Sequence, residues 1–174
     1  MKKTVYLVTG PPGSGKSTTS RRIAEGLEKS AYIEGDIINH MVIGGYKKPW
    51  LSPFHVNLIW LNITTLAKNF IHQEHDVVID YIIFNENIDY FLNELRTEDV
   101  LVKYVVMITD EEELLRRDGR RSPEDQMQER CIIVLKEILD QNVHENHILN
   151  STHLNVDEVV DEIVNNKRFL VEMK

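Results

Sequence analysis

The chain has 174 residues, of which 42% are hydrophobic and 28% are charged. These proportions are typical of a globular protein and exclude intrinsic disorder and fibrous repeats, and the length fits a single domain. The 20 basic and 28 acidic residues leave a net charge of −8, which argues against a surface that coats DNA or RNA.

The chain contains one cysteine, Cys131, so an intrachain disulfide is excluded. We expect this residue to be a small core side chain, because a lone cysteine in a predicted helix is more often packed than reactive. No stretch approaches the roughly 20 apolar residues of a membrane span, and the first apolar run ends at Gly10 without a signal-peptide cleavage site. These features predict a cytoplasmic protein without a membrane partner and leave its oligomeric state open.

Short apolar runs alternate with amphipathic stretches, which predicts strands alternating with helices. In chain order, we expect a strand over 5–8, a helix over 16–28, a strand over 31–33, a short helix over 37–43, a long helix over 54–74, a strand over 76–83, a helix over 87–96, a strand over 101–108, a helix that starts at a capping box of Thr109 and Glu112, a helix over 123–141, a strand over 147–149 and a last helix capped by Asn155 and Glu158. Five strands in this alternation imply an α/β fold with a parallel sheet covered on both faces, in one domain spanning residues 1–174. Ligands of such sheets bind at the carboxyl ends of the strands.

A phosphate-binding signature follows the first predicted strand directly. The segment matches the pattern G-x-x-x-x-G-K-[ST], and its residues are Gly10, Pro11, Pro12, Gly13, Ser14, Gly15, Lys16 and Ser17. Glycines let successive backbone N–H groups face one point, and the start of the following helix adds a positive dipole end. We therefore expect this loop, together with Thr18, to bind ATP, with Lys16 on the β- and γ-phosphates and Ser17 on Mg²⁺.

Other classes of phosphate-loop protein are disfavoured by what the chain lacks. Neither the base-reading pattern [NT]-K-x-D nor the switch pattern D-x-x-G of GTPases occurs. ATP-driven motors usually carry Glu after their second acid, whereas Tyr81 follows Asp80 here. What remains is transfer of the γ-phosphoryl group to a bound acceptor.

The sequence resembles the P-loop small-molecule kinases of the nucleoside monophosphate kinase superfamily, in particular gluconate kinase, shikimate kinase and chloramphenicol phosphotransferase. The resemblance lies in the phosphate loop, in Ile33-Glu34-Gly35-Asp36, in the Arg-rich residues 116–121 and in residues 148–152. It implies a three-layer P-loop fold with a five-stranded sheet of order 2-3-1-4-5, a mobile lid over about 116–124, and an adenine loop over 148–152. The chain departs from gluconate kinase after Asp36 and over residues 80–85, both on the substrate side, so the acceptor is not identified.

Two carboxylates are expected at the ends of strands near the phosphate loop. Asp36 would orient or deprotonate an acceptor hydroxyl, although it could also simply cap a helix. Asp80 would hold Mg²⁺ through its water shell or contact the acceptor, although it could be an ordinary turn residue.

Four arginines flank Asp118 and Gly119 in an otherwise acidic chain, namely Arg116, Arg117, Arg120 and Arg121. Arginines that close over transferring phosphates neutralise the transition state, and Gly119 would allow a hinge. We favour Arg117 and Arg121 as catalytic, with Arg117 also on the nucleotide, and we expect Arg130 to be able to reach the same phosphates. Alternatively, these arginines form a solvent-exposed basic turn without a catalytic role.

The acceptor-binding segment is expected over about 37–75, where Tyr46 and Trp50 with Lys47 and Lys48 could contact an acceptor or simply anchor a loop. The predicted function is an ATP- and Mg²⁺-dependent kinase that phosphorylates a hydroxyl of a small molecule, with a gluconate kinase-like enzyme as one form, and no nucleic acid partner. The alternatives are an antibiotic phosphotransferase, a nucleotide or polynucleotide kinase, and an ATP-binding regulatory or resistance protein with little turnover.

Overall fold

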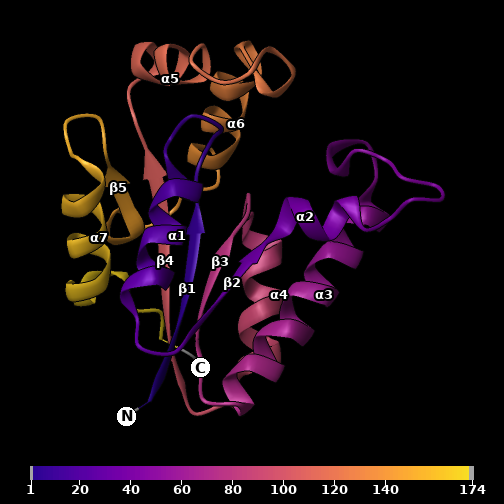
Figure 1. Cartoon of the computed structure of the whole chain (residues 1–174), viewed down its shortest axis with the longest axis vertical. Coiled ribbons are helices and arrows are strands. Elements are labelled where there is room, and N and C mark those ends of the chain that lie inside the picture. Colours follow the sequence, from indigo (N-terminus) through magenta and orange to yellow (C-terminus); the bar gives the residue numbers. More distant parts are fainter. Residues whose placement is uncertain (1, 173–174) are drawn as a thin grey trace.

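The computed structural model describes residues 2–172 and is built on one central sheet (Figure 1). Its strands are β1 (Lys3–Thr9), β2 (Ser30–Glu34), β3 (Asp76–Asp80), β4 (Val100–Ile108) and β5 (Ile148–Asn150). All neighbouring strands pair in parallel, in the order β2-β3-β1-β4-β5. The predicted α/β fold and the predicted strand order 2-3-1-4-5 are therefore confirmed.

Helices cover both faces of this sheet. The helices are α1 (Lys16–Gly26), α2 (Gly35–His40), α3 (Pro53–His72), α4 (Asn85–Leu95), α5 (Glu111–Asp118), α6 (Glu129–Leu139) and α7 (Val156–Asn165), with short 3₁₀ turns at Pro49–Leu51, Pro123–Asp125, Glu145–His147 and Lys167–Phe169. Residues of α1 and α7 share one buried cluster, and residues of α3, α4 and α6 share the other. Figure 1 shows α5 and the loop after it above the carboxyl ends of the strands.

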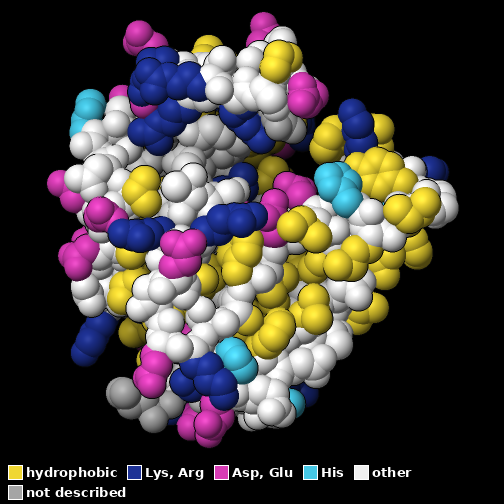
Figure 2. Space-filling model, viewed as in Figure 1, with side chains coloured by type: hydrophobic (Ala, Val, Ile, Leu, Met, Phe, Trp, Pro, Cys, Tyr) yellow, Lys and Arg dark blue, Asp and Glu magenta, His cyan; other side chains and the backbone are white. Residues whose placement is uncertain are grey.

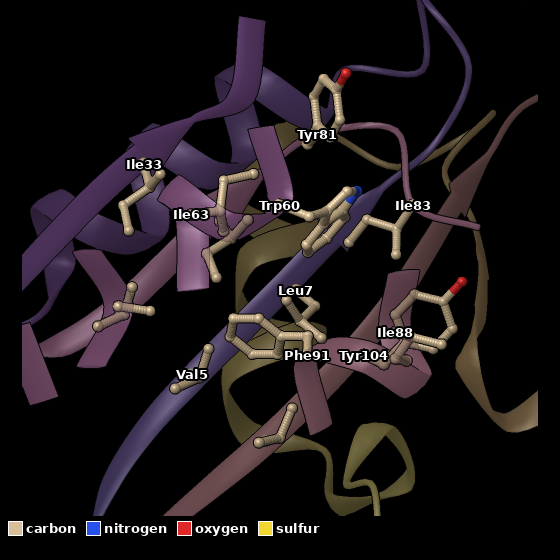
Figure 3. Close-up of a cluster of buried hydrophobic side chains, with 14 of the residues drawn as sticks. Val5, Leu7, Ile33, Trp60, Ile63, Tyr81, Ile83, Ile88, Phe91 and Tyr104 are labelled. Atoms are coloured by element: carbon tan, nitrogen blue, oxygen red, sulfur yellow. The ribbon is translucent and has the colours of Figure 1, made fainter. Parts of the chain in front are cut away.

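The two cores follow from the alternation of side chains along β1. Val5 and Leu7 point into the core under α3 and α4, whereas Tyr6 and Val8 point into the core under α1 and α7. Both sets are apolar, so β1 is buried on both faces, as central strands of parallel sheets usually are. Figure 3 shows the first of these cores, in which Trp60 of α3 lies between the rings of Tyr81 and Phe91 and makes an edge-to-face contact with each.

One charged residue lies inside the second core. Lys103 of β4 is 7% exposed, and its Nζ donates to the carbonyl oxygens of Ile163, Val164 and Asn166 at 2.9, 2.6 and 3.1 Å. These carbonyls end α7 and have no helical N–H partner. The ammonium therefore caps α7 from the sheet, while burial lowers the pKa of Lys103.

Three predicted boundaries are wrong. The helix expected over 123–141 begins at Glu129, because Pro123 opens only a 3₁₀ turn and Gln128 has a φ of 48°, which α-helix cannot continue through. The strand expected over 76–83 ends at Asp80, after which the N–H of Ile83 binds the side-chain hydroxyl of Thr9 in β1 instead of a backbone carbonyl of that strand.

The third error is the capping box at Thr109. The helix cap there is Asp110, and the Thr109 hydroxyl is 2.9 Å from the hydroxyl of Thr152. The capping box of Asn155 and Glu158 on α7 is confirmed, with both reciprocal hydrogen bonds present. Cys131 is fully buried in α6, where burial raises the pKa of its thiol to about 11, so the expected core position is also observed.

Candidate active site

The phosphate loop connects β1 to α1 at the carboxyl edge of the sheet. Gly13 and Gly15 have φ values of 87° and 89°, a left-handed conformation that residues with a side chain rarely adopt. The N–H of Ser14 binds the carbonyl of Pro11 at 3.2 Å, which closes the loop into a turn. Because α1 begins at Lys16, its first N–H groups have no helical acceptor and are available to an anion at this point.

A cleft of about 330 Å³ lies over this loop. Its lining combines residues of the phosphate loop and the start of α1 with one arginine of α5 and one of the loop that follows α5, namely Pro12, Gly13, Gly15, Lys16, Ser17, Thr18, Arg117 and Arg121. The structure thus brings together most of the residues expected at the nucleotide. Gly10, Pro11 and Ser14 are buried beneath the cleft and shape the loop rather than line the cleft.

Arg117 is held over the cleft by two partners. Its Nε donates to Glu113 Oε1 at 2.7 Å, one helical turn earlier, and its Nη2 lies 3.4 Å from the Ser151 carbonyl oxygen after β5. Hydrogen bonds from Arg116 and Arg117 lower the pKa of Glu113 to about 2, so this carboxylate stays ionised. Arg116 also pairs with Glu113, but unlike Arg117 it does not line the cleft.

The lid loop runs from Gly119 to Gln128, because Arg116 and Arg117 belong to the last turn of α5; the predicted range of 116–124 is shifted accordingly. Its two ends are joined by Asp118, which is 2% exposed. The carboxylate of Asp118 accepts from the N–H groups of Met127 and Gln128 at 2.9 and 2.7 Å, and from Arg121 at 3.4 Å.

Burial alone would raise the pKa of Asp118, but these hydrogen bonds outweigh it, and the pKa is lowered. Sequence reasoning treated Asp118 only as a neighbour of the arginines. An isolated acid inside a basic cluster was the available signal for its structural role.

Asp36 and Asp80 lie on the other side of the phosphate loop. Asp36 stands in the first turn of α2, where Glu34, not Asp36, occupies the cap position. Asp36 is exposed at the surface, yet desolvation by the protein atoms around its carboxyl group raises its pKa. Lys16 opposes this effect, and Asp80 and Glu34 add to it, so these four charges act on one another across the site.

The surroundings of Asp80 fit the expected magnesium ion. Asp80 is 3% exposed, and its Oδ2 accepts a hydrogen bond of 2.8 Å from the Tyr32 hydroxyl. Its Oδ1 is buried and has no hydrogen-bond partner within residues 2–172. No cluster of three or more His, Cys, Asp or Glu side chains that could hold a metal ion is found within residues 2–172.

A second cavity, of about 110 Å³, adjoins Asp36. It lies between the acceptor segment and α6, and its lining residues are Asp36, Pro49, Trp50, Val56, Tyr81, Ile82, Phe84, Asn87, Met127, Arg130, Val134 and Glu137. The expectation that Arg130 shares the phosphate site is not met in this arrangement, because Arg130 lines this cavity and pairs with Glu137. Figure 2 shows the surface hollowed between the basic lid and the projecting, largely hydrophobic acceptor segment.

A residue that sequence reasoning missed holds the acceptor segment in place. His55, at the start of α3, is 4% exposed, and its Nε2 accepts the N–H of Lys47 at 3.2 Å. Its Nδ1 therefore carries the hydrogen and donates to the Ser52 hydroxyl at 2.8 Å. This pair of bonds closes the loop that carries Trp50 to the cavity.

Residues 5–142 match the protein family described as "AAA domain". The chain belongs to this family. The match contains the phosphate loop, both acidic positions and the whole lid. No curated protein sequence matches the chain. No helix within residues 2–172 is long and apolar enough to cross a membrane.

Several solved structures share the fold. The APS kinase of Mycobacterium tuberculosis, in complex with AMPPNP and APS, superposes with a TM-score of 0.67 at 16% identity, over 94% of this chain and 96% of that chain. A gluconokinase from Sinorhizobium meliloti 1021 superposes with a TM-score of 0.56 at 18% identity, over 93% of this chain and 89% of that chain. A chain of the Pnkp1/Rnl/Hen1 RNA repair complex gives 0.58 at 19% identity, over 80% of this chain and only 46% of that one. The fold is that of the P-loop small-molecule kinases, as the sequence resemblance implied.

Proposed function

We propose that this protein is an ATP- and Mg²⁺-dependent kinase that transfers the γ-phosphoryl group of ATP to a hydroxyl group of a small molecule. The observation that carries this proposal is the position of Asp36. It lines the acceptor cavity, and Lys16 of the phosphate loop is close enough to lower its pKa. A carboxylate between a phosphate site and a second cavity is where a hydroxyl would be aligned for attack.

Each group has a distinct role in this reaction. Lys16 and the backbone N–H groups of the loop hold the β- and γ-phosphates, and Arg117 and Arg121 neutralise charge on the transferring group. The acceptor oxygen bonds to the γ-phosphorus as the bond between that phosphorus and the β,γ-bridging oxygen breaks, and ADP leaves. The hydroxyl proton passes to Asp36, whose raised pKa suits a proton acceptor.

Ser17 and Asp80 are the residues that would hold Mg²⁺, which supplies further charge neutralisation at the phosphates. Ser17 lines the phosphate cleft and Asp80 offers the unpartnered Oδ1 beside it. Closure of the lid loop over this arrangement excludes water, which suppresses hydrolysis of ATP.

The proposal is tested by ADP release from Mg-ATP in the presence of a panel of acceptors. Lys16→Ala should abolish ATP binding and turnover. Asp36→Asn should lower kcat by about 10²- to 10⁴-fold while ATP affinity stays within about threefold, because the carboxylate acts on the acceptor and not on ATP. Asp89→Asn, an exposed acid on α4 away from both cavities, is the matched control and should leave turnover unchanged. Undiminished turnover in the Asp36 or the Lys16 variant would contradict the assignment.

The fold shared with a chain of an RNA repair complex makes a polynucleotide 5′-kinase the second candidate. A 5′-hydroxyl oligonucleotide therefore belongs in the acceptor panel. The net charge of −8 and the small cavity favour a small molecule over a nucleic-acid end. A regulatory ATP-binding protein would instead bind ATP tightly and release ADP at the same low rate with every acceptor.

A further inference from the structure

The cavity beside Asp36 is small and mainly apolar. It measures about 110 Å³, and an apolar protein cavity of about 150 Å³ holds benzene. The apolar part of its lining includes Trp50, Tyr81, Phe84 and Val134. The cavity is smaller than that one but is bordered by the half-exposed Trp50, and it thus has the walls of a site for one apolar ring next to a carboxylate.

The charged residues of the lining do not favour an anion. They are two carboxylates, Asp36 and Glu137, and one guanidinium, Arg130. Both terminal nitrogens of Arg130 already bind Glu137, with Nη1–Oε1 and Nη2–Oε2 distances of 3.2 and 3.3 Å. A carboxylate or phosphate on the acceptor would meet a negative balance of charge and a guanidinium held by another partner.

Trp50 is placed to contact such an acceptor. It is 53% exposed, an unusual exposure for the largest apolar side chain, although it lines the cavity. The guanidinium carbon of Arg130 lies 6.0 Å from the centroid of the Trp50 ring, so the ring faces α6 across the cavity. Covering the exposed indole with an apolar group would remove it from water, and this is where binding free energy is available.

From these contacts, and on the basis of the function proposed above, we infer that the acceptor is an uncharged alcohol with an apolar, ring-sized body that packs on Trp50 and presents its hydroxyl to Asp36. This substrate class differs from the sugar acids of a gluconate kinase. Tyr81 supports the inference, because its buried ring forms the wall next to Asp36 and its hydroxyl points away from the core (Figure 3).

Four probe compounds separate the effect of an aromatic ring on binding from the effect of a negative charge. Phenylpropanediol is uncharged and carries a ring, phenyllactate is an anion with the same ring, glycerol is uncharged without a ring, and glycerate is an anion without one. We measure the Kd of each by NMR titration of the full chain with Mg-AMPPNP bound. Phenylpropanediol should bind at least about tenfold more tightly than the other three, because only it satisfies both the apolar wall and the charge balance.

Two variants test the residues named. Trp50→Ala should weaken the binding of phenylpropanediol about tenfold. Leu51→Ala removes an exposed neighbour outside the cavity lining and should change the Kd of phenylpropanediol less than twofold. Glu137→Gln leaves Arg130 without its anionic partner and should tighten the binding of phenyllactate about fivefold. Equal or tighter binding of either acid to the unmodified protein, or no saturable binding of phenylpropanediol, overturns the inference.

The binding order does not depend on catalysis, so the two proposals fail separately. If phenylpropanediol binds as expected and no acceptor stimulates ADP release, the ligand class of the cavity stands and the kinase activity is refuted. If gluconate or another acid is phosphorylated efficiently, the kinase activity stands and the acceptor class is refuted.

Discussion

At the scale of single residues, the site is organised by charges placed close together at the ends of β2 and β3. Asp36 carries a raised pKa because the surrounding protein desolvates it, and because Asp80 and Glu34 repel its negative charge, while Lys16 works in the opposite direction. The balance leaves Asp36 able to take up a proton more readily than an ordinary aspartate.

This electrostatic balance gives a prediction for pH. Asp36 should titrate above the usual range of an aspartate in ¹³C NMR, and Asp80→Asn should shift that titration to lower pH by removing a neighbouring negative charge. Asp99→Asn, at the opposite edge of the sheet, should leave the titration of Asp36 in place.

The raised pKa of Asp36 also determines how its contribution to the stability of the fold changes with pH. Since the folded state binds this proton more tightly than the unfolded state, the contribution of Asp36 is fully present below the unfolded pKa and is lost as the pH rises through the folded one. A titration of Asp36 at or below the ordinary range would refute the proposed coupling.

At the scale of elements, α7 depends on a contact with the sheet as well as on its own sequence. Its first turn is capped locally by Asn155 and Glu158. Its last turn is capped by Lys103, which lies about 60 residues away along the chain. The helix thus has one end determined by adjacent residues and the other by the tertiary fold.

Lys103→Met should therefore destabilise the protein. The substitution keeps the apolar stem but leaves three carbonyl oxygens at the end of α7 without their donor, and we expect the free energy of unfolding to fall by about 1–3 kcal/mol. Chemical denaturation measures the change, with Lys167→Met as the control. Lys167 is exposed, so its substitution should fall within about 0.5 kcal/mol of the parent. Equal stability of the two variants would contradict a capping role for Lys103.

At the scale of the whole molecule, two segments that are far apart in the sequence extend over the carboxyl edge of the sheet. The lid loop after α5 lies above the phosphate cleft, and the segment between α2 and α3 lies to one side of it (Figure 1). The two parts meet at the second cavity, where Met127 and Arg130 face Trp50. The phosphate cleft and the second cavity therefore share no lining residue and are separate hollows.

The lid gives a prediction for limited proteolysis. Arg120 and Arg121 are exposed in the loop, so trypsin should cut there first, and Mg-AMPPNP at saturation should slow that cut by at least about tenfold through contact with Arg121 and ordering of the loop. Lys16→Ala should be cut at the parent's unprotected rate with or without nucleotide. Protection of the Lys16 variant, or none in the parent, would show that the lid does not respond to nucleotide at this site.

Features defined by neighbouring residues could be predicted from the sequence. The phosphate loop, the buried strand Val77-Val78-Ile79 and the α7 capping box each depend on a few adjacent residues whose backbone and burial preferences agree. The strand order came from family resemblance, because alternation alone predicts a parallel sheet without arranging its strands.

Features that join distant segments were decided only by the tertiary structure. Arg130 lines the second cavity and pairs with Glu137 on α6, a helix that starts later than its sequence pattern predicts. Asp118 organises the lid through N–H groups freed by that late start, and His55 supports Trp50 through a loop that no periodic pattern describes. Local conformational preference decides whether a residue lies in a helix, a strand or a loop. The surface that its side chain faces depends on how that element packs against distant parts of the chain.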